Sequence, residues 1–299
     1  MRHFRITAVL LGMVALGASA FAANPARPGA VNYIEGTAYL DGRQLNNQNV
    51  GTAEMEPGQV LSTGQGKAEI LLTPGIFLRL DDQSAVKMTS PDLTNTQVEL
   101  EQGRASVEVD QIFPQNQVQI VDGGATTQVV KPGYYEFDAT HPEAMVFNGQ
   151  AEVALGANKW EEIKGHHELA LTGAVDGAHV KTANFDAHGT GDELYNWSSL
   201  RSQYLAEANN DIAREYSGAG FYPGWYWDPY GWDYTFIGVD PFLSPFGWGF
   251  YPWGGWGGWG YWGGFGRGYY GRGFYGGGGF YGGGGEFHGG GFHGGGGRR

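Results

Sequence analysis

The sequence predicts an all-β domain followed by one helix and a glycine-rich, aromatic tail. Three observations support this prediction. Residues 23–173 hold short runs in which apolar and polar residues alternate, and residues 191–217 place apolar residues at helical spacing. Residues from 218 onward are mostly glycine and aromatic. A chain with three compositions is expected to have three parts that fold differently.

The β segment consists of runs that alternate on either side of a turn. Residues 67–82 (KAEILLTPGIFLRLDD) alternate before and after a Pro-Gly turn, which is typical of a half-buried antiparallel pair. Residues 98–110 (VELEQGRASVEVD) repeat this pattern around a Gln-Gly turn. Residues 144–155 (AMVFNGQAEVAL) hold an Asn-Gly pair, which is preferred in tight two-residue hairpins. Strands at intervals of about 8–12 residues indicate a sandwich, a roll or a solenoid of short antiparallel strands.

A single helix is predicted after the β segment. Asp192 is placed to cap its N-terminus, and Gly218 is placed to end it. The apolar residues that recur every three or four positions are Leu194, Trp197, Leu200, Tyr204, Ala208, Ile212 and Tyr216. This stripe predicts a structural role, with the helix docked on the β domain.

The remaining boundaries follow from composition. We expect a linker and the helix over residues 174–217, an extended Pro/aromatic segment over 218–253 and a low-complexity tail over 254–299. The extended segment can pack on the β domain, because Trp and Tyr bury large areas and tolerate a wet edge. The tail has few aliphatic side chains to offset the entropy lost when glycine is ordered. We therefore expect it to be disordered or loosely self-associating.

The first 22 residues contain the parts of a signal peptide in order. Arg2 and Arg5 precede an apolar run at residues 6–16, and residues 20–22 (AFA) fit the small-x-small cleavage rule. The run is too short to span a bilayer. The alternative to a signal peptide is a short buried helix. We expect export to the periplasm or the extracellular space. No later stretch has the length of a transmembrane helix, and no cysteine is present for disulfides or lipid attachment.

The chain is acidic, with a formal net charge of −13 at pH 7. An acidic exported protein is a poor binder of anionic partners, so neither nucleic acid nor acidic lipid is expected. The stretch around Arg267 and Arg272 resembles the Arg-Gly and aromatic mixtures that stack on single-stranded nucleic acid. Two arginines in an acidic chain do not change the expectation.

Several motifs of the β segment have the order and spacing of a known domain family. They are GQVLSTG at residues 58–64, AEI at 68–70, LRL at 78–80, LEQGRASVEV at 100–109 and FNGQAEV at 147–153. On these motifs, residues 29–172 resemble the FecR domain family. One departure is the Lys-Pro-Gly at residues 131–133, where the family usually has Gly-Thr. The whole chain resembles secreted FecR-domain proteins of the acidobacterial type, which end in a segment rich in glycine and aromatic residues.

The resemblance implies a role only in part. Members of this family are often sensors of iron uptake, with a cytoplasmic segment that controls a sigma factor. Five residues precede the apolar run in this chain, so we do not expect the regulator role to carry over. The resemblance implies instead a secreted, non-catalytic β domain of the kind used for contact with a partner or with the cell wall.

No catalytic, metal or cofactor site is predicted, and we expect a protein that is not an enzyme. The carboxylate pairs Glu99 with Glu101 and Glu108 with Asp110 lie on outward strand faces. We expect a solvated rim there rather than the cleft that hydrolytic pairs need. His166 and His167 could bind a metal, but adjacent residues on a strand point to opposite faces, so no shared site is expected. The sequence has no nucleophile elbow, phosphate-binding loop or zinc-ligand spacing.

The first functional hypothesis is an exported binding or structural module of the bacterial envelope, whose aromatic segment makes many weak contacts. Aromatic faces stack on sugars and on each other. The candidate binding residues are Trp225, Trp227, Trp232, Trp248, Trp253, Trp256, Trp259 and Trp262. The expected partner is an envelope protein, a cell-wall glycan or a second copy of the chain. The alternative is an envelope signalling component related to FecR-type sensors, acting through a membrane partner. A hydrolase with an unrecognised site is the third hypothesis.

Overall fold

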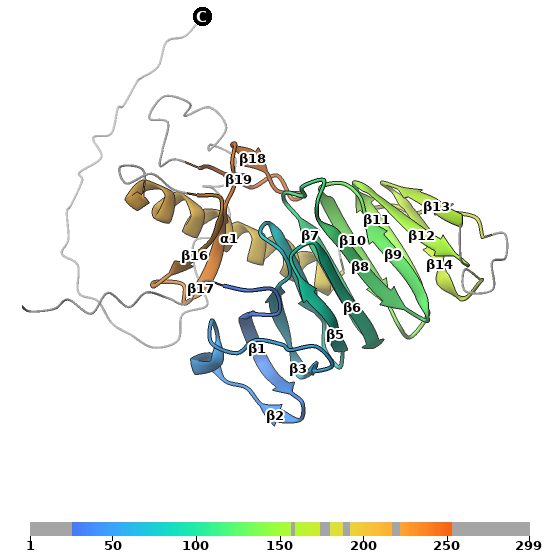
Figure 1. Cartoon of the computed structure of the whole chain (residues 1–299), viewed down its shortest axis with the longest axis horizontal. Coiled ribbons are helices and arrows are strands. Elements are labelled where there is room, and N and C mark those ends of the chain that lie inside the picture. The colour runs from blue at the N-terminus through green and yellow to red at the C-terminus, as the bar shows by residue number, and fades with distance from the viewer. Residues whose placement is uncertain (1–25, 157–158, 174–179, 188–191, 217–221, 253–299) are drawn as a thin grey trace, which may run out of the picture. The chain divides into compact units, whose positions relative to one another are not determined.

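The computed structural model describes residues 26–156, 159–173, 180–187, 192–216 and 222–252 (Figure 1). The predicted signal peptide at residues 1–22 and the predicted low-complexity tail at 254–299 lie outside the described residues. Within the part of the chain that is described, no helix is long and apolar enough to cross a membrane.

Strands and one α-helix make up the described chain. The elements before the α-helix are β1 (Val31–Leu40), β2 (Arg43–Gln44), the 3-10 helix η1 (Asn47–Asn49), β3 (Val60–Leu71), β4 (Ile76–Leu80), β5 (Ala85–Asp92), β6 (Asn95–Gln102), β7 (Arg104–Val109), β8 (Gln117–Asp122), β9 (Ala125–Val129), β10 (Gly133–Asp138), β11 (Glu143–Asn148), β12 (Gln150–Leu155), β13 (Lys159–Lys164), β14 (His167–Ala170), the 3-10 helix η2 (Leu171–Gly173) and β15 (Ala183–Asn184). They are followed by α1 (Glu193–Tyr216), β16 (Gly224–Asp228), β17 (Asp233–Ile237), β18 (Phe242–Leu243) and β19 (Gly249–Phe250). The predicted class, all-β with one helix after the sheet, is confirmed.

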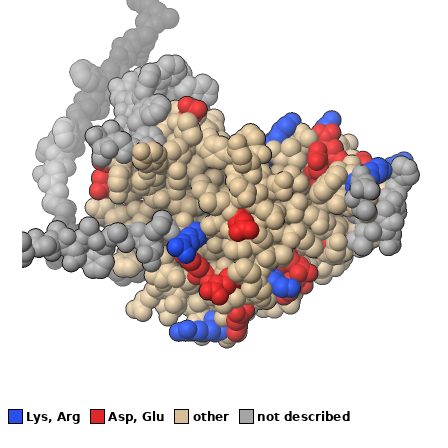
Figure 2. Space-filling view, viewed as in Figure 1, with Lys and Arg blue, Asp and Glu red and all other residues tan. Residues whose placement is uncertain are grey.

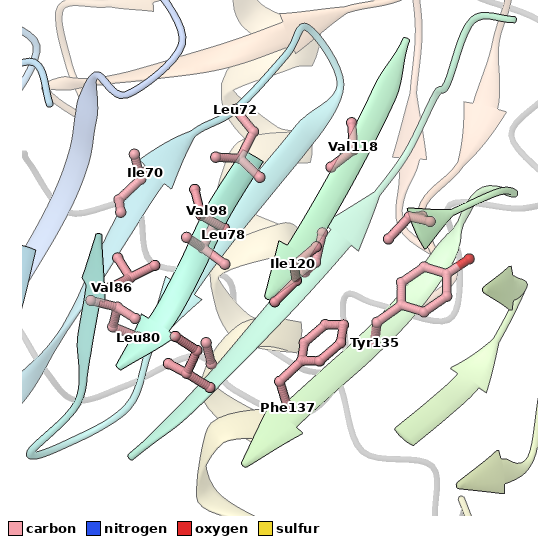
Figure 3. Close-up of a cluster of buried hydrophobic side chains, with 14 of the residues drawn as sticks. Ile70, Leu72, Leu78, Leu80, Val86, Val98, Val118, Ile120, Tyr135 and Phe137 are labelled. Carbon is pink, nitrogen blue, oxygen red and sulfur yellow. The ribbon is translucent and has the colours of Figure 1, made fainter. Parts of the chain in front are cut away.

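The large sheet folds over at β3, so that two arms enclose one core. The first residues of β3 pair with β5, and the last residues pair with β4. The β5 arm continues as β5-β6-β8-β9-β12-β13, and the β4 arm continues as β4-β7-β10-β11-β14-β15. Val98 and Ile120 of the β5 arm share a buried cluster with Leu78 and Tyr135 of the β4 arm (Figure 3). This arrangement is the sandwich or roll that the strand spacing predicts.

Two of the three predicted hairpins are wrong. Residues 67–82 do form an antiparallel pair, β3 with β4, in which Ile70 lies opposite Leu78. The strands on either side of Gly103, β6 and β7, belong to different arms and do not pair. The same holds for β11 and β12, on either side of Gly149. The chain therefore crosses from one arm to the other at these glycines.

Backbone geometry explains why glycine stands at the crossings. Gly103 and Gly149 have φ angles of 71° and 95°, which favour glycine. A Cβ at Gly149 would collide with the hydroxyl of Tyr135 and lie 2.7 Å from the carbonyl of Pro132. Asn148 fixes this crossing, since its side chain accepts a 2.6 Å hydrogen bond from the amide of Tyr134. The turn residues were identified correctly, but each turn connects strands of different arms and not paired strands of one arm.

One strand pair is parallel, in contrast to the antiparallel strands that were expected. Strand β6 runs parallel to β8, with Val98 opposite Ile120. The chain leaves β6 for the β4 arm, forms β7 there and returns to the β5 arm for β8. A connection that crosses to another layer can bring a strand back in the same direction, which a tight hairpin cannot do.

Helix α1 packs on the outer face of the β4 arm (Figure 1). Asp192 caps it as predicted, accepting a 2.7 Å hydrogen bond from the amide of Tyr195. The predicted apolar stripe is only partly the buried side, because Leu200 and Tyr204 are 46% and 47% exposed. The residues that α1 buries are Leu194, Ser198, Arg201, Ser202, Leu205, Ala206, Ala208, Asn209, Ile212 and Ala213. Much of the docked face is polar.

The outer face of β4, β7 and β10 is covered and not half-exposed. Every residue of β4 is buried, in contrast to the half-buried pair that the alternation predicts. Outward-facing Phe77 lies in a second apolar cluster with Leu205 of α1 and Phe236 of β17. Extended segments of the Pro/aromatic region thus pack on the β domain, together with α1.

Candidate functional site

Charged side chains line the outer face of β3, β4 and β7. Glu69, Arg79 and Glu108 have no accessible surface. Arg79 lies opposite Glu69 in the strand pairing, and its Nε donates a 2.7 Å hydrogen bond to that carboxylate. Its Nη1 donates a 2.5 Å hydrogen bond to Glu108 on the neighbouring strand. One guanidinium thus lies between two buried carboxylates.

Arg201 of α1 joins this group to the C-terminal strands. Its Nη2 donates hydrogen bonds to Glu69 at 3.0 Å and to Asp233 of β17 at 2.8 Å. Its guanidinium also lies over the ring of Tyr33, 4.0 Å from the centroid. Burial would raise the pKa of Glu69, but Arg201 and Arg79 together lower it to about 2. Glu69 is therefore held in its charged form by two arginines from different elements.

Hydrogen bonds complete the attachment of α1 and β17. The hydroxyl of Ser202 donates a 2.5 Å hydrogen bond to Glu108. The amide of Asn32 in β1 donates to Glu69 at 2.8 Å, and its carbonyl oxygen accepts from the backbone amide of Tyr234 at 2.6 Å. We name Glu69, Arg79, Glu108, Arg201 and Asp233 the interlayer network. It links the sheet, the helix and the C-terminal hairpin.

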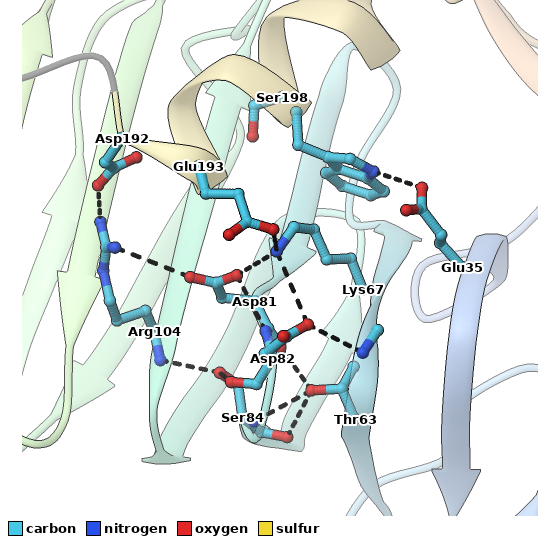
Figure 4. A network of polar contacts seen from close by, with 12 residues as sticks. Glu35, Thr63, Lys67, Asp81, Asp82, Ser84, Arg104, Asp192, Glu193 and Ser198 are labelled. Atoms are coloured by element: carbon cyan, nitrogen blue, oxygen red, sulfur yellow. Dashed lines mark hydrogen bonds and ion pairs between the residues drawn. The ribbon is translucent and has the colours of Figure 1, made fainter. Parts of the chain in front are cut away.

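A second polar group ties the N-terminus of α1 to the sheet (Figure 4). Arg104 of β7 contacts Asp192, the residue that caps the helix. Glu193, in the first turn, forms an ion pair with Lys67, whose Nζ lies 3.2 Å from Oε1 of Glu193. The same Nζ lies 2.5 Å from Oδ1 of Asp81. Acidic residues at a helix N-terminus are favourable because they oppose the helix dipole. The start of α1 is therefore fixed by charge as well as by packing.

The carboxylate pairs of the sequence behave in two different ways. Glu99 and Glu101 of β6 are partly exposed, and Lys87 lies 3.4 Å from Glu99, as expected for a solvated rim. The expectation is wrong for Glu108 and Asp110, which are buried because α1 and the C-terminal strands cover their face. Burial and the neighbouring Glu108 raise the pKa of Asp110 well above its usual value. In this conformation the pair has too little accessible surface to act on a substrate.

A pH dependence of stability follows from Glu136 of β10. Burial and the nearby Asp192 raise its pKa to about 7, although Arg104 favours the charged form. In the unfolded chain this carboxyl loses its proton near pH 4.5, so the folded state gains stability from it below that pH. The contribution is lost as the pH rises to about 7.

We expect Glu136→Gln to flatten the stability profile between pH 5 and pH 8 by about 1–3 kcal/mol. The amide keeps an acceptor for the hydroxyl of Tyr134. Urea unfolding at both pH values measures the effect, with the partly exposed Glu99→Gln as control. If the free energy of unfolding of Glu136→Gln changed between pH 5 and pH 8 as much as that of the wild type, the assignment would be refuted.

Three of the predicted binding tryptophans are packing residues. Trp225 lies edge-on to Phe77, with ring centroids 4.9 Å apart. Trp227 lies edge-on to Tyr234 at 5.0 Å. The indole of Trp248 donates a 3.0 Å hydrogen bond to the carbonyl of Ser199 in α1. Trp253, Trp256, Trp259 and Trp262 lie outside the described residues.

Trp232 differs from the other described tryptophans of this segment, because 67% of it is exposed. It lies in the turn between β16 and β17, together with Tyr230, which is 88% exposed. We name residues 228–233 (DPYGWD) the aromatic turn. Tyr230 was not predicted, although Asp-Pro followed by glycine between two aromatic strands is a turn signal.

The side chain of Asp228 holds the aromatic turn in place. Its two oxygens accept 2.9 Å hydrogen bonds from the amides of Tyr230 and Gly231. Its carbonyl accepts another from the amide of Trp232, also at 2.9 Å. Trp232 has a φ of 56°, a conformation that a bulky residue adopts only where its surroundings impose it. The two exposed rings therefore project from a defined backbone.

A cavity of about 490 Å³ lies beside β2 and the loop that follows it. Its lining includes Asp41, Arg43, Glu54, Glu56 and Gln59. Among the described residues, no group of histidine and acidic side chains could hold a metal ion. The charged and amide side chains of the lining can form hydrogen bonds with a ligand.

The visible face of the molecule carries no broad patch of one charge. Lys and Arg lie beside Asp and Glu in small mixed groups, and uncharged side chains cover most of this face (Figure 2). Such a face does not attract a polyanion by charge alone.

Comparison with known proteins identifies one domain family. The model of the FecR protein family matches residues 59–152, from the start of β3 into β12. The FecR resemblance is confirmed for that segment. A candidate anti-sigma factor from Parabacteroides distasonis, known from a crystal structure, is similar over 49% of this chain and 64% of its own, with 14% identity and a TM-score of 0.36. The chain thus spans less than two thirds of that protein. No curated protein matches the sequence.

Proposed function

We propose that this protein is a non-catalytic binding module of the bacterial envelope, exported to the periplasm or beyond. FecR proteins are envelope-associated regulators rather than enzymes, and the FecR match covers the core of the sheet. The proposal rests on one observation: the chain covers the outer face of β4, β7 and β10 with its own helix and C-terminal strands. Contact with a partner then falls to surfaces that this cover leaves exposed, among them the aromatic turn.

The interlayer network supports this division of roles. Glu69 and Glu108 of the sheet are bound by Arg201 and Ser202 of α1. Removing one partner of a buried ion pair leaves an uncompensated charge, at a cost of about 3–5 kcal/mol. An external partner would have to displace these bonds to reach the β4 arm. The exposed aromatic turn requires no such displacement.

Retention on purified cell wall and envelope extract tests the proposal. Three forms are compared: the chain from residue 23 to 299, the chain ending at Pro252, and the chain ending at Pro252 with Tyr230→Ala and Trp232→Ala. We expect retention to fall at each step, because aromatic contacts are removed at each step. Tyr204→Ala, an exposed helix residue, is the matched control and leaves retention unchanged. Equal retention of all three forms would move recognition to the sheet.

The FecR match also favours a second candidate, an envelope signalling component that acts through a membrane partner. Deleting the gene would then change the output of a sigma factor or transporter in the same cell. A transcript profile unchanged by the deletion, together with cell-wall retention of the purified protein, contradicts signalling and leaves the binding role.

A further inference from the structure

We propose that the aromatic turn and the loop of residues 47–54 together form a binding site for an uncharged saccharide. This inference rests on the proposed function and adds to it a ligand class and a place. It concerns described residues only. The aromatic turn supplies flat rings, and the loop together with the cavity beside it supplies hydrogen-bonding groups.

The aromatic turn has the properties of a stacking platform. Tyr230 and Trp232 are mostly exposed, and Asp228 fixes the backbone between them. Trp232 also contacts Trp227 edge-on, with ring centroids 6.3 Å apart. Rings that are held in place before binding lose little entropy when a ligand stacks on them. The C–H faces of a sugar ring are suited to such a surface.

The loop of residues 47–54 packs against Trp227, the residue that precedes the aromatic turn. Gly51 faces Trp227 so closely that a Cβ there would come within 2.6 Å of the indole. Exposed amide side chains precede this contact at Asn47 and Gln48. Trp227 thus connects the loop that carries these amides to the ring of Trp232.

The cavity shares the same loop. Asn49, Thr52 and Glu54 line it from the loop, while Arg43 and Glu56 line it from the flanking chain. Amides and carboxylates accept hydrogen bonds from sugar hydroxyls, and Arg43 donates to ring or hydroxyl oxygens. Ligand sites commonly combine an apolar or aromatic wall with a few polar groups of this kind.

Charge selects among saccharides. Asp41, Glu54 and Glu56 outnumber Arg43 in the cavity, so an anionic polymer such as polygalacturonate would meet like charge. A hydroxyl-rich, uncharged chain meets acceptors for its hydroxyls and rings for its C–H faces. A peptide partner would also stack on the rings, and the experiment separates that outcome.

The test uses chitohexaose, cellohexaose and maltohexaose as uncharged probes and polygalacturonate as the anionic probe. Binding to the chain of residues 23–299 is measured by isothermal titration. We expect at least one uncharged probe to bind and polygalacturonate not to bind. Trp232→Ala is expected to weaken that binding by about tenfold or more. Trp232→Phe, which keeps a ring, and the control Tyr204→Ala are expected to retain it.

Outcomes that overturn the inference are distinct from those that overturn the proposed function. Retention on envelope extract without binding to any saccharide probe rejects the saccharide and keeps the binding module. Saccharide binding that is equal in Trp232→Ala and in wild type rejects the site. Thermal unfolding of each variant identifies a misfolded one, and Tyr230→Ala then serves as the second variant, with the same expected loss.

Discussion

Replacing Arg79 with methionine is expected to lower the free energy of unfolding by about 3–5 kcal/mol. Methionine fills most of the space of the arginine side chain but removes its charge. Glu69 and Glu108 then face each other across β4, with Arg201 and Asn32 as the remaining partners of Glu69 and Ser202 as that of Glu108. Asp110, whose pKa burial and Glu108 already raise, lies next to the same carboxylate.

Urea unfolding at pH 7 measures this effect. The matched control is Lys87→Met, because Lys87 pairs with Glu99 at the surface, where both side chains are about two-fifths exposed. Surface pairs contribute about 0–1 kcal/mol. A loss of less than 1 kcal/mol in Arg79→Met would contradict a network in which the charges depend on one another.

Ending the chain at Ser217 is expected to abolish cooperative unfolding of the β domain. This truncation removes β17, whose Asp233 pairs with Arg201 and whose Thr235 donates a 2.6 Å hydrogen bond to the carbonyl of Leu205. It also removes Phe236, which covers Phe77. Each buried aromatic residue contributes roughly 1.5–3 kcal/mol, so the summed loss approaches the 5–15 kcal/mol stability of an ordinary domain.

Calorimetry of two truncated chains checks this prediction. The chain ending at Pro252 keeps β16 to β19 and is expected to melt within a few degrees of the chain of residues 23–299. The chain ending at Ser217 is expected to show no sharp transition. Two equal transitions would mean that the C-terminal strands contribute little to stability. If the prediction holds, a truncation at Ser217 cannot be used to test partner binding.

The class of the fold and the position of its helix could be predicted from the sequence. Alternation with period two identifies strands, and the spacing of Leu194 to Tyr216 identifies α1. The partners of each strand could not be predicted in the same way. A glycine with positive φ is required both in a hairpin and at a crossing between layers, so Gly103 and Gly149 do not distinguish the two.

The burial of this sheet face could not be predicted from the sequence, because the face carries charged residues. Glu69, Arg79 and Glu108 alternate with apolar residues, which is also the pattern of a solvent-exposed face. Their opposite charges lie on adjacent strands and match Arg201 and Ser202 on the helix. A helix with serine, arginine and asparagine between its apolar positions is a signal for a polar docking surface, and it was available in the sequence.

The binding role of the tryptophans stays a prediction, and the structure shows how differently those that it describes are packed. Trp225, Trp227 and Trp248 are held by packing or hydrogen bonds within the chain. Composition cannot separate a ring that covers a core from a ring that projects into solvent. The separating feature is the turn at Asp228, which places Tyr230 and Trp232 outside the packed strands.

The central claim is that partners contact the projecting aromatic turn and not the covered sheet face. Site-specific photo-cross-linking tests it most directly, with a photoreactive phenylalanine analogue placed at Tyr230 or, as control, at the exposed helix residue Tyr204. Both forms are irradiated on purified envelope material. We predict adducts from position 230 and none from position 204. Adducts from position 204 alone, or equal adducts from both, would contradict the account.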